Sequence, residues 1–324
     1  MEVAIGGASG YLGQHLTAEL IARSAKVRAI VRTESPPDDL ALLQKLGATI
    51  FAGKFVDVDV DDTKADSAIA RAFAGADCAV NLIGSVAPPR NGPGVDELHR
   101  LYSLRFARAC VKASVKKAVL VTALGANENS KSKYLSSKRL AEKAFIDCLT
   151  QAGISCTVVR PSLIVGRLVG SRDSKLVDRY RTILNTRPVV PLVGGGLNML
   201  EPIFVGDLAK AIANILEGHA DGDGDNVSGE IVELAGPQKM TMRAFVEDLA
   251  RSMHVTKPMV NMPPGVAAVA AGFLSLVQEV PLLSGDQVKL AQEDMTTSVN
   301  ALPALLAPAA PTTLQAALES YQSK

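Results

Sequence analysis

The sequence lacks the features that mark several large classes of protein. Its 34 lysines and arginines nearly balance its 33 acidic residues, leaving a net charge of +1 and no excess of positive charge for binding nucleic acid. Its four cysteines show no Cys-x-x-Cys spacing and do not cluster near a histidine, as a zinc site would require. Its longest weakly polar stretch, Val266–Val280, lies between prolines and is shorter than the roughly 20 residues that span a bilayer. We therefore expect reduced thiols and no metal, nucleic-acid partner or transmembrane segment.

Several familiar catalytic and metal-binding arrangements are also missing. The sequence contains no P-loop and no Ser-His-Asp arrangement, and its four histidines are scattered without metal spacing. The segment Asp57–Asp61 imitates the start of a calcium loop, but Asp62 stands where glycine is needed and Ala68 where the bidentate glutamate is needed. We interpret this segment as a solvated acidic loop.

The first half alternates short β-branched runs with longer helical stretches. Leu12, Leu16 and Leu20, for example, recur at the spacing of one helix face. This alternation is typical of βαβ units and predicts a doubly wound α/β fold around a parallel sheet. The expected strands are Glu2–Gly6, Lys26–Val31, Thr49–Phe51, Cys78–Ile83, Lys117–Thr122 and Ser155–Arg160.

The rhythm changes after Pro161, where glycine clusters and isolated helices replace the alternation. We expect a nucleotide-binding domain over 1–165 and a smaller C-terminal lid over 166–324, with about 201–236 returning to the first domain. Such a lid would cover the carboxyl edge of the sheet, where open α/β folds bind ligands. Two further elements are expected, a buried strand at Ile231–Leu234 and a helix at Met242–Met253 with Thr241 as its N-cap.

A glycine-rich motif follows the first expected strand and opens the first expected helix. It has the form Gly-x-x-Gly-x-x-Gly, in which glycines allow a tight turn and let backbone amides approach a pyrophosphate at the helix N-terminus. The strand before it and the helix after it favour dinucleotide binding over a purely structural turn. The candidate cofactor-binding residues here are Gly7, Ser9, Gly10, Tyr11, Leu12 and Gly13.

The residue at the end of the second strand indicates which dinucleotide is bound. An acid at this position bonds the ribose 2′-hydroxyl of NAD(H), whereas an arginine accepts the 2′-phosphate of NADP(H). Arg32 occupies the position and no acid lies between Ala29 and Thr33, so we predict NADP(H). A strand that ended two residues later would bring Glu34 into play and reverse this choice.

A Tyr-x-x-x-Lys motif is the strongest sign of chemistry. Tyr134 and Lys138 lie four apart in an expected helix, so the phenol and the ammonium share one face. A nearby ammonium lowers a tyrosine pKa toward values useful in proton transfer to a carbonyl. Thr122, at the carboxyl end of the fifth strand, is the candidate to orient that carbonyl. The alternative is a structural helix with an exposed lysine.

These motifs together resemble an atypical short-chain dehydrogenase/reductase of the extended type. The resemblance covers most of the first half and implies that Ile83, Gly84 and Pro161 also contact the cofactor, as do Thr122 and the Tyr-x-x-x-Lys pair. It rests on the glycine motif, the Tyr-x-x-x-Lys motif, Asn81–Gly84, Val121–Ala126, Arg160–Ser162, Val165–Gly166, Glu201–Ala209 and Leu234–Pro237.

The C-terminal stretch Pro281–Leu290, followed by Glu293–Met295, narrows the resemblance. It is similar to the NADPH-binding, Rossmann-type accessory subunits of respiratory complex I (NADH:ubiquinone oxidoreductase) and their bacterial relatives. That similarity implies a peripheral protein on the matrix side of the mitochondrial inner membrane, or in a bacterial cytoplasm. It also implies contact with other complex I subunits and a nucleotide held without turnover.

Two other functions fit the same nucleotide site. One is a free NADPH-dependent reductase or epimerase that uses Tyr134 and Lys138; the other is a sensor that reports the redox state of NADP(H) to a partner. The apolar segment 258–280 suits protein or membrane-surface contact better than the polar lid of an enzyme, and packing inside the lid is its other explanation.

The residue that contacts adenine is not clearly aligned, with Lys54 and Asp57 as candidates.

Overall fold

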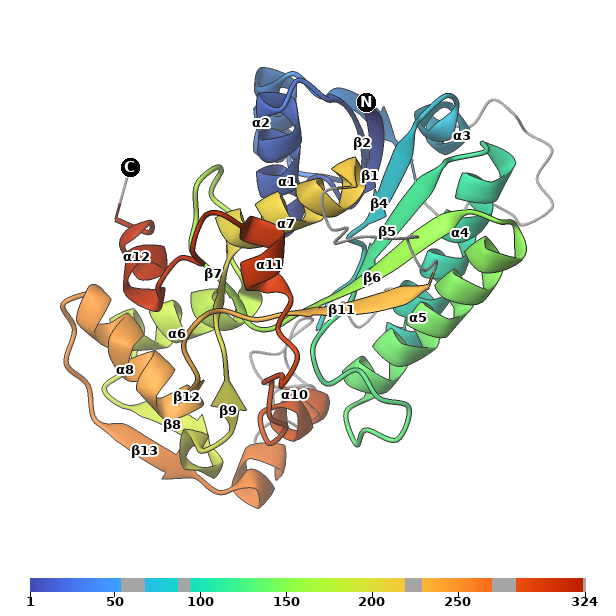
Figure 1. The fold of residues 1–324 in the computed structure, drawn as a ribbon. Coiled ribbons are helices and arrows are strands. Elements are labelled where there is room, and N and C mark those ends of the chain that lie inside the picture. Colours follow the sequence, from blue (N-terminus) through green and yellow to red (C-terminus); the bar gives the residue numbers. More distant parts are fainter. Residues whose placement is uncertain (54–67, 87–93, 219–228, 270–283, 323–324) are drawn as a thin grey trace.

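The fold is built on one parallel sheet of seven strands. A computed structural model describes residues 1–53, 68–86, 94–218, 229–269 and 284–322. The strand order is β11-β6-β5-β4-β1-β2-β3, and every neighbouring pair runs parallel (Figure 1). This order confirms the predicted doubly wound fold. The strands are β1 (Glu2–Gly6), β2 (Lys26–Val31), β3 (Thr49–Ala52), β4 (Cys78–Asn81), β5 (Lys117–Val121), β6 (Ser155–Pro161) and β11 (Glu230–Leu234).

Helices cover both faces of the sheet (Figure 1). On one face Leu16 and Leu20 pack into a core with Ile5, and on the other Phe106 and Phe145 are fully buried. The first face carries α1 (Tyr11–Ala22), α2 (Pro37–Leu46), α7 (Val205–Glu217) and α11 (Leu302–Leu306); the second carries α3 (Ala68–Phe73), the π-helix η1 (Glu97–Leu101), α4 (Tyr102–Lys112) and α5 (Lys133–Gln151).

The observed strand ends differ little from the expected ones, and one difference has a clear cause. β4 stops at Asn81, two residues early, because the Asn81 side chain accepts a hydrogen bond from the backbone N–H of Ile83 (3.0 Å) and turns the chain. Since all seven strands are parallel, their carboxyl ends meet at one edge of the sheet. The strands β2 and β3 lie on one side of β1, and β4, β5 and β6 lie on the other. The strand order therefore reverses between β1 and β4, and such folds usually bind their ligand at this point of the edge.

A second cluster of elements forms the lid beside that edge (Figure 1). Its own core contains Val177, Leu184 and Phe245. Thr241 accepts a hydrogen bond from the Ala244 N–H and confirms the predicted N-cap of α8. The elements are β7 (Ile164–Val165), α6 (Lys175–Thr186), β8 (Val190–Val193), η2 (Gly194–Gly196), β9 (Met199–Leu200), β10 (Ile203–Phe204), β12 (Met240–Thr241), α8 (Met242–Ser252), β13 (Met259–Met262), α10 (Gly285–Leu290) and α12 (Leu314–Glu319).

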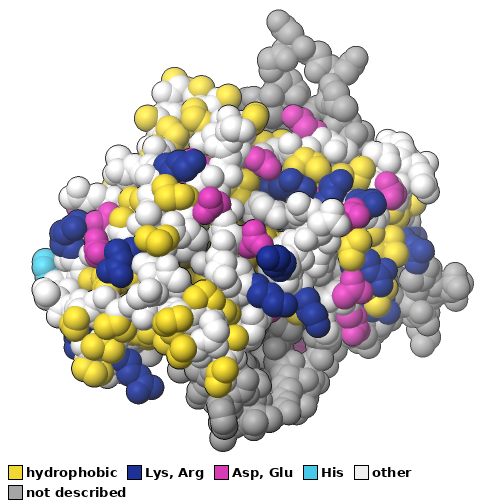
Figure 2. All heavy atoms as spheres, turned by 90° about the horizontal axis from the view of Figure 1, so that it is seen from below, with side chains coloured by type: hydrophobic (Ala, Val, Ile, Leu, Met, Phe, Trp, Pro, Cys, Tyr) yellow, Lys and Arg dark blue, Asp and Glu magenta, His cyan; other side chains and the backbone are white. Residues whose placement is uncertain are grey.

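The lid carries exposed apolar side chains. Val266 and Val269 follow β13 and are 58% and 63% exposed, and hydrophobic side chains gather on the lid side of the face in Figure 2. Among the described residues, no helix combines the length and apolarity needed to cross a membrane. Three sequence predictions lie outside the described residues: the acidic segment Asp57–Asp61, the adenine candidates Lys54 and Asp57, and the 270–280 part of the apolar segment.

Candidate functional site

The glycine motif forms a tight cradle after β1, at the point where the strand order of the sheet reverses. Gly7 adopts a left-handed conformation with φ of +82°. The Gly7 carbonyl accepts a hydrogen bond from the Gly10 N–H (2.9 Å). A Cβ added to Gly13 would lie 2.4 Å from the Gly7 carbonyl oxygen, so no other residue fits there. Helix α1 is thereby packed closely against the turn that follows β1.

The start of α1 suits an anionic group. Its N-cap is Gly10, which offers no side-chain hydrogen bond, and the first turn carries no acidic residue. The first amides of a helix have no intrahelical partner, and the helix dipole adds partial positive charge at this end. These residues therefore fit the pyrophosphate of a dinucleotide, in the way the glycine motif predicts.

The residues after β2 meet the glycine motif. β2 ends at Val31, so Arg32 is the first residue beyond it and is exposed. Glu34 lies two residues further and accepts a hydrogen bond from Thr33 (2.6 Å). Ser9 of the motif lies 3.2 Å from Ser35, Oγ to Oγ. β2 thus ends where the NADP(H) prediction requires, directly before Arg32. The choice of NADP(H) itself stays a prediction.

Tyr134 and Lys138 lie together on α5 close to the loop after β4. The Lys138 Nζ is 5.9 Å from the centre of the Tyr134 ring and donates to the Val121 carbonyl (3.5 Å). A Cβ added to Gly84 would come within 2.7 Å of that Nζ. The structure therefore brings the Tyr-x-x-x-Lys pair to the carboxyl edge, beside a glycine whose lack of a side chain makes room for the ammonium.

Burial sets the protonation of this pair, and the expected effect of Lys138 on Tyr134 was wrong. Burial raises the pKa of Tyr134 to about 12. Burial also lowers the pKa of Lys138 to about 8, against the opposing attraction of Glu142. The ammonium lies over the Tyr134 ring, and desolvation disfavours the charged form of each group. A phenol with this pKa is a weak proton donor and a scarce phenolate at neutral pH.

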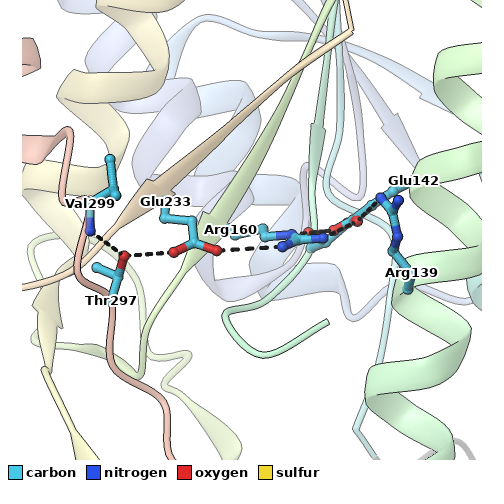
Figure 3. Close-up of polar contacts among 7 residues, drawn as sticks. Arg139, Glu142, Arg160, Glu233, Thr297 and Val299 are labelled. Atoms are coloured by element: carbon cyan, nitrogen blue, oxygen red, sulfur yellow. Dashed lines mark hydrogen bonds and ion pairs between the residues drawn. The ribbon is translucent and has the colours of Figure 1, made fainter. Parts of the chain in front are cut away.

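The Thr122 hydroxyl has a different partner from the one we expected. It donates to Glu142 Oε1 (2.7 Å), and Glu142 is a fully buried carboxylate on α5. Arg160 of β6 binds both carboxylate oxygens, at 2.8 and 2.6 Å (Figure 3). This contact draws the hydroxyl into a buried ionic network, and the role predicted for Thr122 in orienting a carbonyl stays a prediction. The network extends to Arg139, Glu233, Thr297 and the backbone of Val299.

His99 belongs to the site although its spacing in the sequence gives no sign of it. Its Nε2 accepts the Ser85 N–H (3.2 Å), its Nδ1 lies 2.8 Å from Ser137 Oγ, and its ring packs edge-on against Tyr134. Burial and the Lys138 charge lower the pKa of His99 to about 2, so the ring is neutral. His99 stands on the π-helix η1, a rare conformation that often occurs at functional sites.

The C-terminal segment fixes the start of α5. The Asp286 carboxylate of α10 accepts the Lys133 N–H (2.6 Å), the Tyr134 N–H (3.0 Å) and the Ser132 hydroxyl (3.0 Å). It thus caps a helix that lies about 150 residues earlier in the chain. Sequence reasoning singled out this C-terminal stretch only by resemblance and missed this contact.

The other predicted site residues lie at the same edge of the sheet. Ile83 is the second residue after β4 and donates its N–H to the Asn81 side chain. Pro161 ends β6, and its carbonyl accepts the Leu124 N–H (2.9 Å). Tyr11 donates to the Gly166 carbonyl, and Leu12 is buried under the motif. The fold therefore brings the predicted cofactor residues together, and their contacts with a nucleotide stay a prediction.

Comparison with known sequences agrees with the predicted resemblance. The chain is 28% identical over 305 residues to "NADH dehydrogenase [ubiquinone] 1 alpha subcomplex subunit 9, mitochondrial" of Arabidopsis thaliana, covering 91% of this chain and 71% of that one. The protein of the same name from Dictyostelium discoideum is 27% identical, with 91% and 77% covered. A ceramide reductase of Caulobacter vibrioides is 29% identical over 191 residues, with 59% and 53% covered.

Solved structures and family models agree on the fold. UDP-glucuronic acid 4-epimerase from Bacillus cereus, solved with UDP-glucuronic acid and NAD, superposes with a TM-score of 0.68 at 14% identity, covering 99% of this chain and 97% of that one. The model for the NAD dependent epimerase/dehydratase family matches residues 3–235, which span the glycine motif, the Tyr-x-x-x-Lys motif and most of the sheet. The chain belongs to the NAD dependent epimerase/dehydratase family.

Proposed function

We propose that this protein is a nucleotide-binding accessory subunit of a respiratory complex I, and that it holds NADP(H) without turning it over. The similarity to the alpha subcomplex subunits covers nine tenths of the chain, including the C-terminal part that the family model leaves out. The glycine cradle, the open start of α1 and Arg32 supply what the nucleotide's phosphates require.

The hydrogen bond from Thr122 to the buried Glu142 (2.7 Å) is the observation that favours holding over turnover. The pKa of Tyr134 is raised to about 12 by burial, far from the range in which a general acid works best. The Thr122 hydroxyl, which would orient a carbonyl, donates instead to Glu142. A nucleotide bound at this edge of the sheet would stabilise the fold by linkage, by about 2.7 kcal/mol at 100 times its dissociation constant.

The lid supplies a surface for partners. Its exposed valines at positions 260, 266 and 269 suit contact with neighbouring subunits or with the membrane surface, as expected of a peripheral protein. We place the protein on the matrix side of the mitochondrial inner membrane, with the cytoplasmic side of a bacterial membrane as the equivalent site.

Isolation under native conditions tests this assignment. The protein would be extracted in mild detergent and its apparent mass recorded beside NADH-oxidising activity. We expect it to co-migrate with a very large NADH-oxidising assembly. A free monomer or dimer, with no fraction in such an assembly, would contradict the proposal.

A free NADPH-dependent reductase or epimerase is the second candidate. The ceramide reductase similarity and the presence of both Tyr134 and Lys138 favour it. A panel of carbonyl substrates, ceramide precursors included, would be assayed for NADPH oxidation. Turnover by the wild type that disappears in Tyr134→Phe would support this candidate over the first.

A further inference from the structure

Basic side chains from both parts of the molecule converge beside the nucleotide site. Arg32 comes from the end of β2, Arg172 from the segment that leads into α6, and Lys175 and Arg179 from the first turns of α6. Partial burial lowers the pKa of Lys175, and so do the charges of the three arginines. Each of these three arginine charges is therefore close enough to act on Lys175. Lys and Arg side chains also gather beside a hollow in Figure 2.

Two of these side chains connect the lid to the nucleotide-binding domain. The Lys175 Nζ donates to Ser85 Oγ (2.9 Å), four residues after β4. The Arg172 Nε donates to Asp39 Oδ2 of α2 (2.8 Å). The other oxygen of Asp39 accepts Gln14 Nε2 (2.8 Å), and the same amide reaches the Ser9 carbonyl in the glycine motif (3.2 Å). Three hydrogen bonds in series thus join Arg172 to the cradle.

The Asp39 carboxylate balances Arg172, so the charges that an added anion could still neutralise are those of the other cations. Within the described part of the chain, neither Arg32 nor Arg179 forms an ion pair with a carboxylate, and the buried Nε of Arg179 has no hydrogen-bond partner. Lys175 is the first residue of α6, where the positive end of the helix dipole opposes a cation. A doubly charged phosphate among these side chains would offset the repulsion between Lys175 and the arginines.

We propose that Lys175 and Arg172 of the lid join Arg32 in binding the 2′-phosphate of NADP(H), so that this phosphate bridges the two parts of the molecule. The inference rests on the proposed function, in which the carboxyl edge of the sheet holds this nucleotide. The amides at the start of α1 would bind the pyrophosphate, whereas the 2′-phosphate would lie toward Arg32. NADH lacks that phosphate, so it would bind without drawing in the lid.

Nucleotide titrations of the full chain test the proposal. The affinities for NADPH and NADH would be measured by nucleotide fluorescence, which the absence of tryptophan simplifies. We expect Lys175→Met to weaken NADPH about tenfold, the loss of one charge-assisted contact, and to change NADH by less than about threefold. Lys210→Met, an exposed lysine of α7, is the matched control and should change neither affinity.

Hydrogen exchange supplies a second readout that does not depend on affinity alone. NADPH should slow amide exchange in residues 166–175 of the wild type, whereas NADH and the Lys175→Met variant with NADPH should not. Equal weakening of both nucleotides, or unchanged NADPH affinity, would overturn the bridging role while leaving nucleotide binding intact. A wild type that binds neither nucleotide would overturn the proposed function itself.

Discussion

At the scale of single residues, burial dominates the electrostatics of the site. Desolvation shifts the pKa values of Tyr134, Lys138 and His99 so that each side chain favours its neutral form. A buried charge of either sign is costly. The contacts that favour the charged forms of Lys138 and His99 do not offset this cost. These residues therefore give the protein a pH dependence that can be measured without any substrate.

Replacement of Lys138 should stabilise the protein without nucleotide. Its pKa is 10.5 in the unfolded chain and about 8 in the folded protein. The folded state therefore becomes more stable as the pH rises from about 8 to 10.5, and below pH 8 it carries the full cost of the buried charge. We expect Lys138→Met to increase the free energy of unfolding at pH 7 by about 1 to 3 kcal/mol and to remove the rise above pH 8. Urea unfolding checks this, with the exposed Lys143→Met as control. A loss of stability at pH 7 would contradict it.

His99 should make the protein sensitive to mild acid. Its pKa is about 2 in the folded state and 6.5 when unfolded, so the unfolded chain gains a proton first and stability falls as the pH drops below 6.5. Between pH 7 and pH 5 the loss amounts to about 2 kcal/mol. His15 is also buried, with a lowered pKa, and adds in the same direction.

A variant comparison isolates the His99 contribution. The change in unfolding free energy from pH 7 to pH 5 should be smaller in His99→Gln than in the wild type by about 2 kcal/mol. His254→Asn, at an exposed position with positive φ that asparagine tolerates, should keep the wild-type slope. Equal slopes in all three proteins would show that His99 is not buried in its neutral form.

At the scale of elements, helix α5 is fixed at its start by Asp286 and at its middle by Glu142. Between these two points lie Tyr134 and Lys138, which are therefore positioned by β6 and by the C-terminal segment rather than by α5 alone. The two anchors differ in energy. One is a helix cap, and the other is an ion pair between a fully buried glutamate and a partly exposed arginine.

Removal of the buried charge should be the more damaging change. Glu142→Gln replaces the buried carboxylate by a neutral amide while Arg160 keeps Glu233 (3.4 Å), so we expect a cost below the roughly 3 to 5 kcal/mol of a fully isolated buried charge, at about 2 to 3 kcal/mol. Loss of the exposed pair between Lys143 and Glu128 (2.9 Å) through Glu128→Gln should cost less than about 1 kcal/mol. Similar unfolding midpoints for the two variants would show that the network carries no such weight.

Removal of the cap should have a smaller effect. Asp286→Ala takes the acceptor from three donors at the start of α5, and the loss of an N-cap costs about 0.5 to 2 kcal/mol. Asp147→Ala, an exposed acid on the same helix, should change stability by less than about 0.5 kcal/mol. Thermal unfolding distinguishes the two, and an Asp286 variant as stable as the Asp147 variant would refute the capping role.

At the scale of the whole molecule, the sequence predicts what local periodicity and motifs encode. The alternation of strands and helices predicts the sheet, and the glycine motif predicts the turn after β1 because few other residues fit there. Contacts between distant segments leave no local signal. The cap from Asp286 to α5, the place of His99 beside Tyr134, and the meeting of Arg32 with Lys175 all depend on tertiary packing. The pKa of Tyr134 was mispredicted for the same reason, because spacing shows a nearby lysine but not burial.

The central claim is that the protein holds NADP(H) without turnover, and an assay of the bound nucleotide tests it most directly. The native protein would be purified with its assembly, driven through NADH oxidation, and then denatured so that the released nucleotide is identified and counted. The account predicts about one NADP(H) per chain, with the same amount and redox state before and after turnover. NAD(H) in its place, or NADPH that is consumed during turnover, would contradict it.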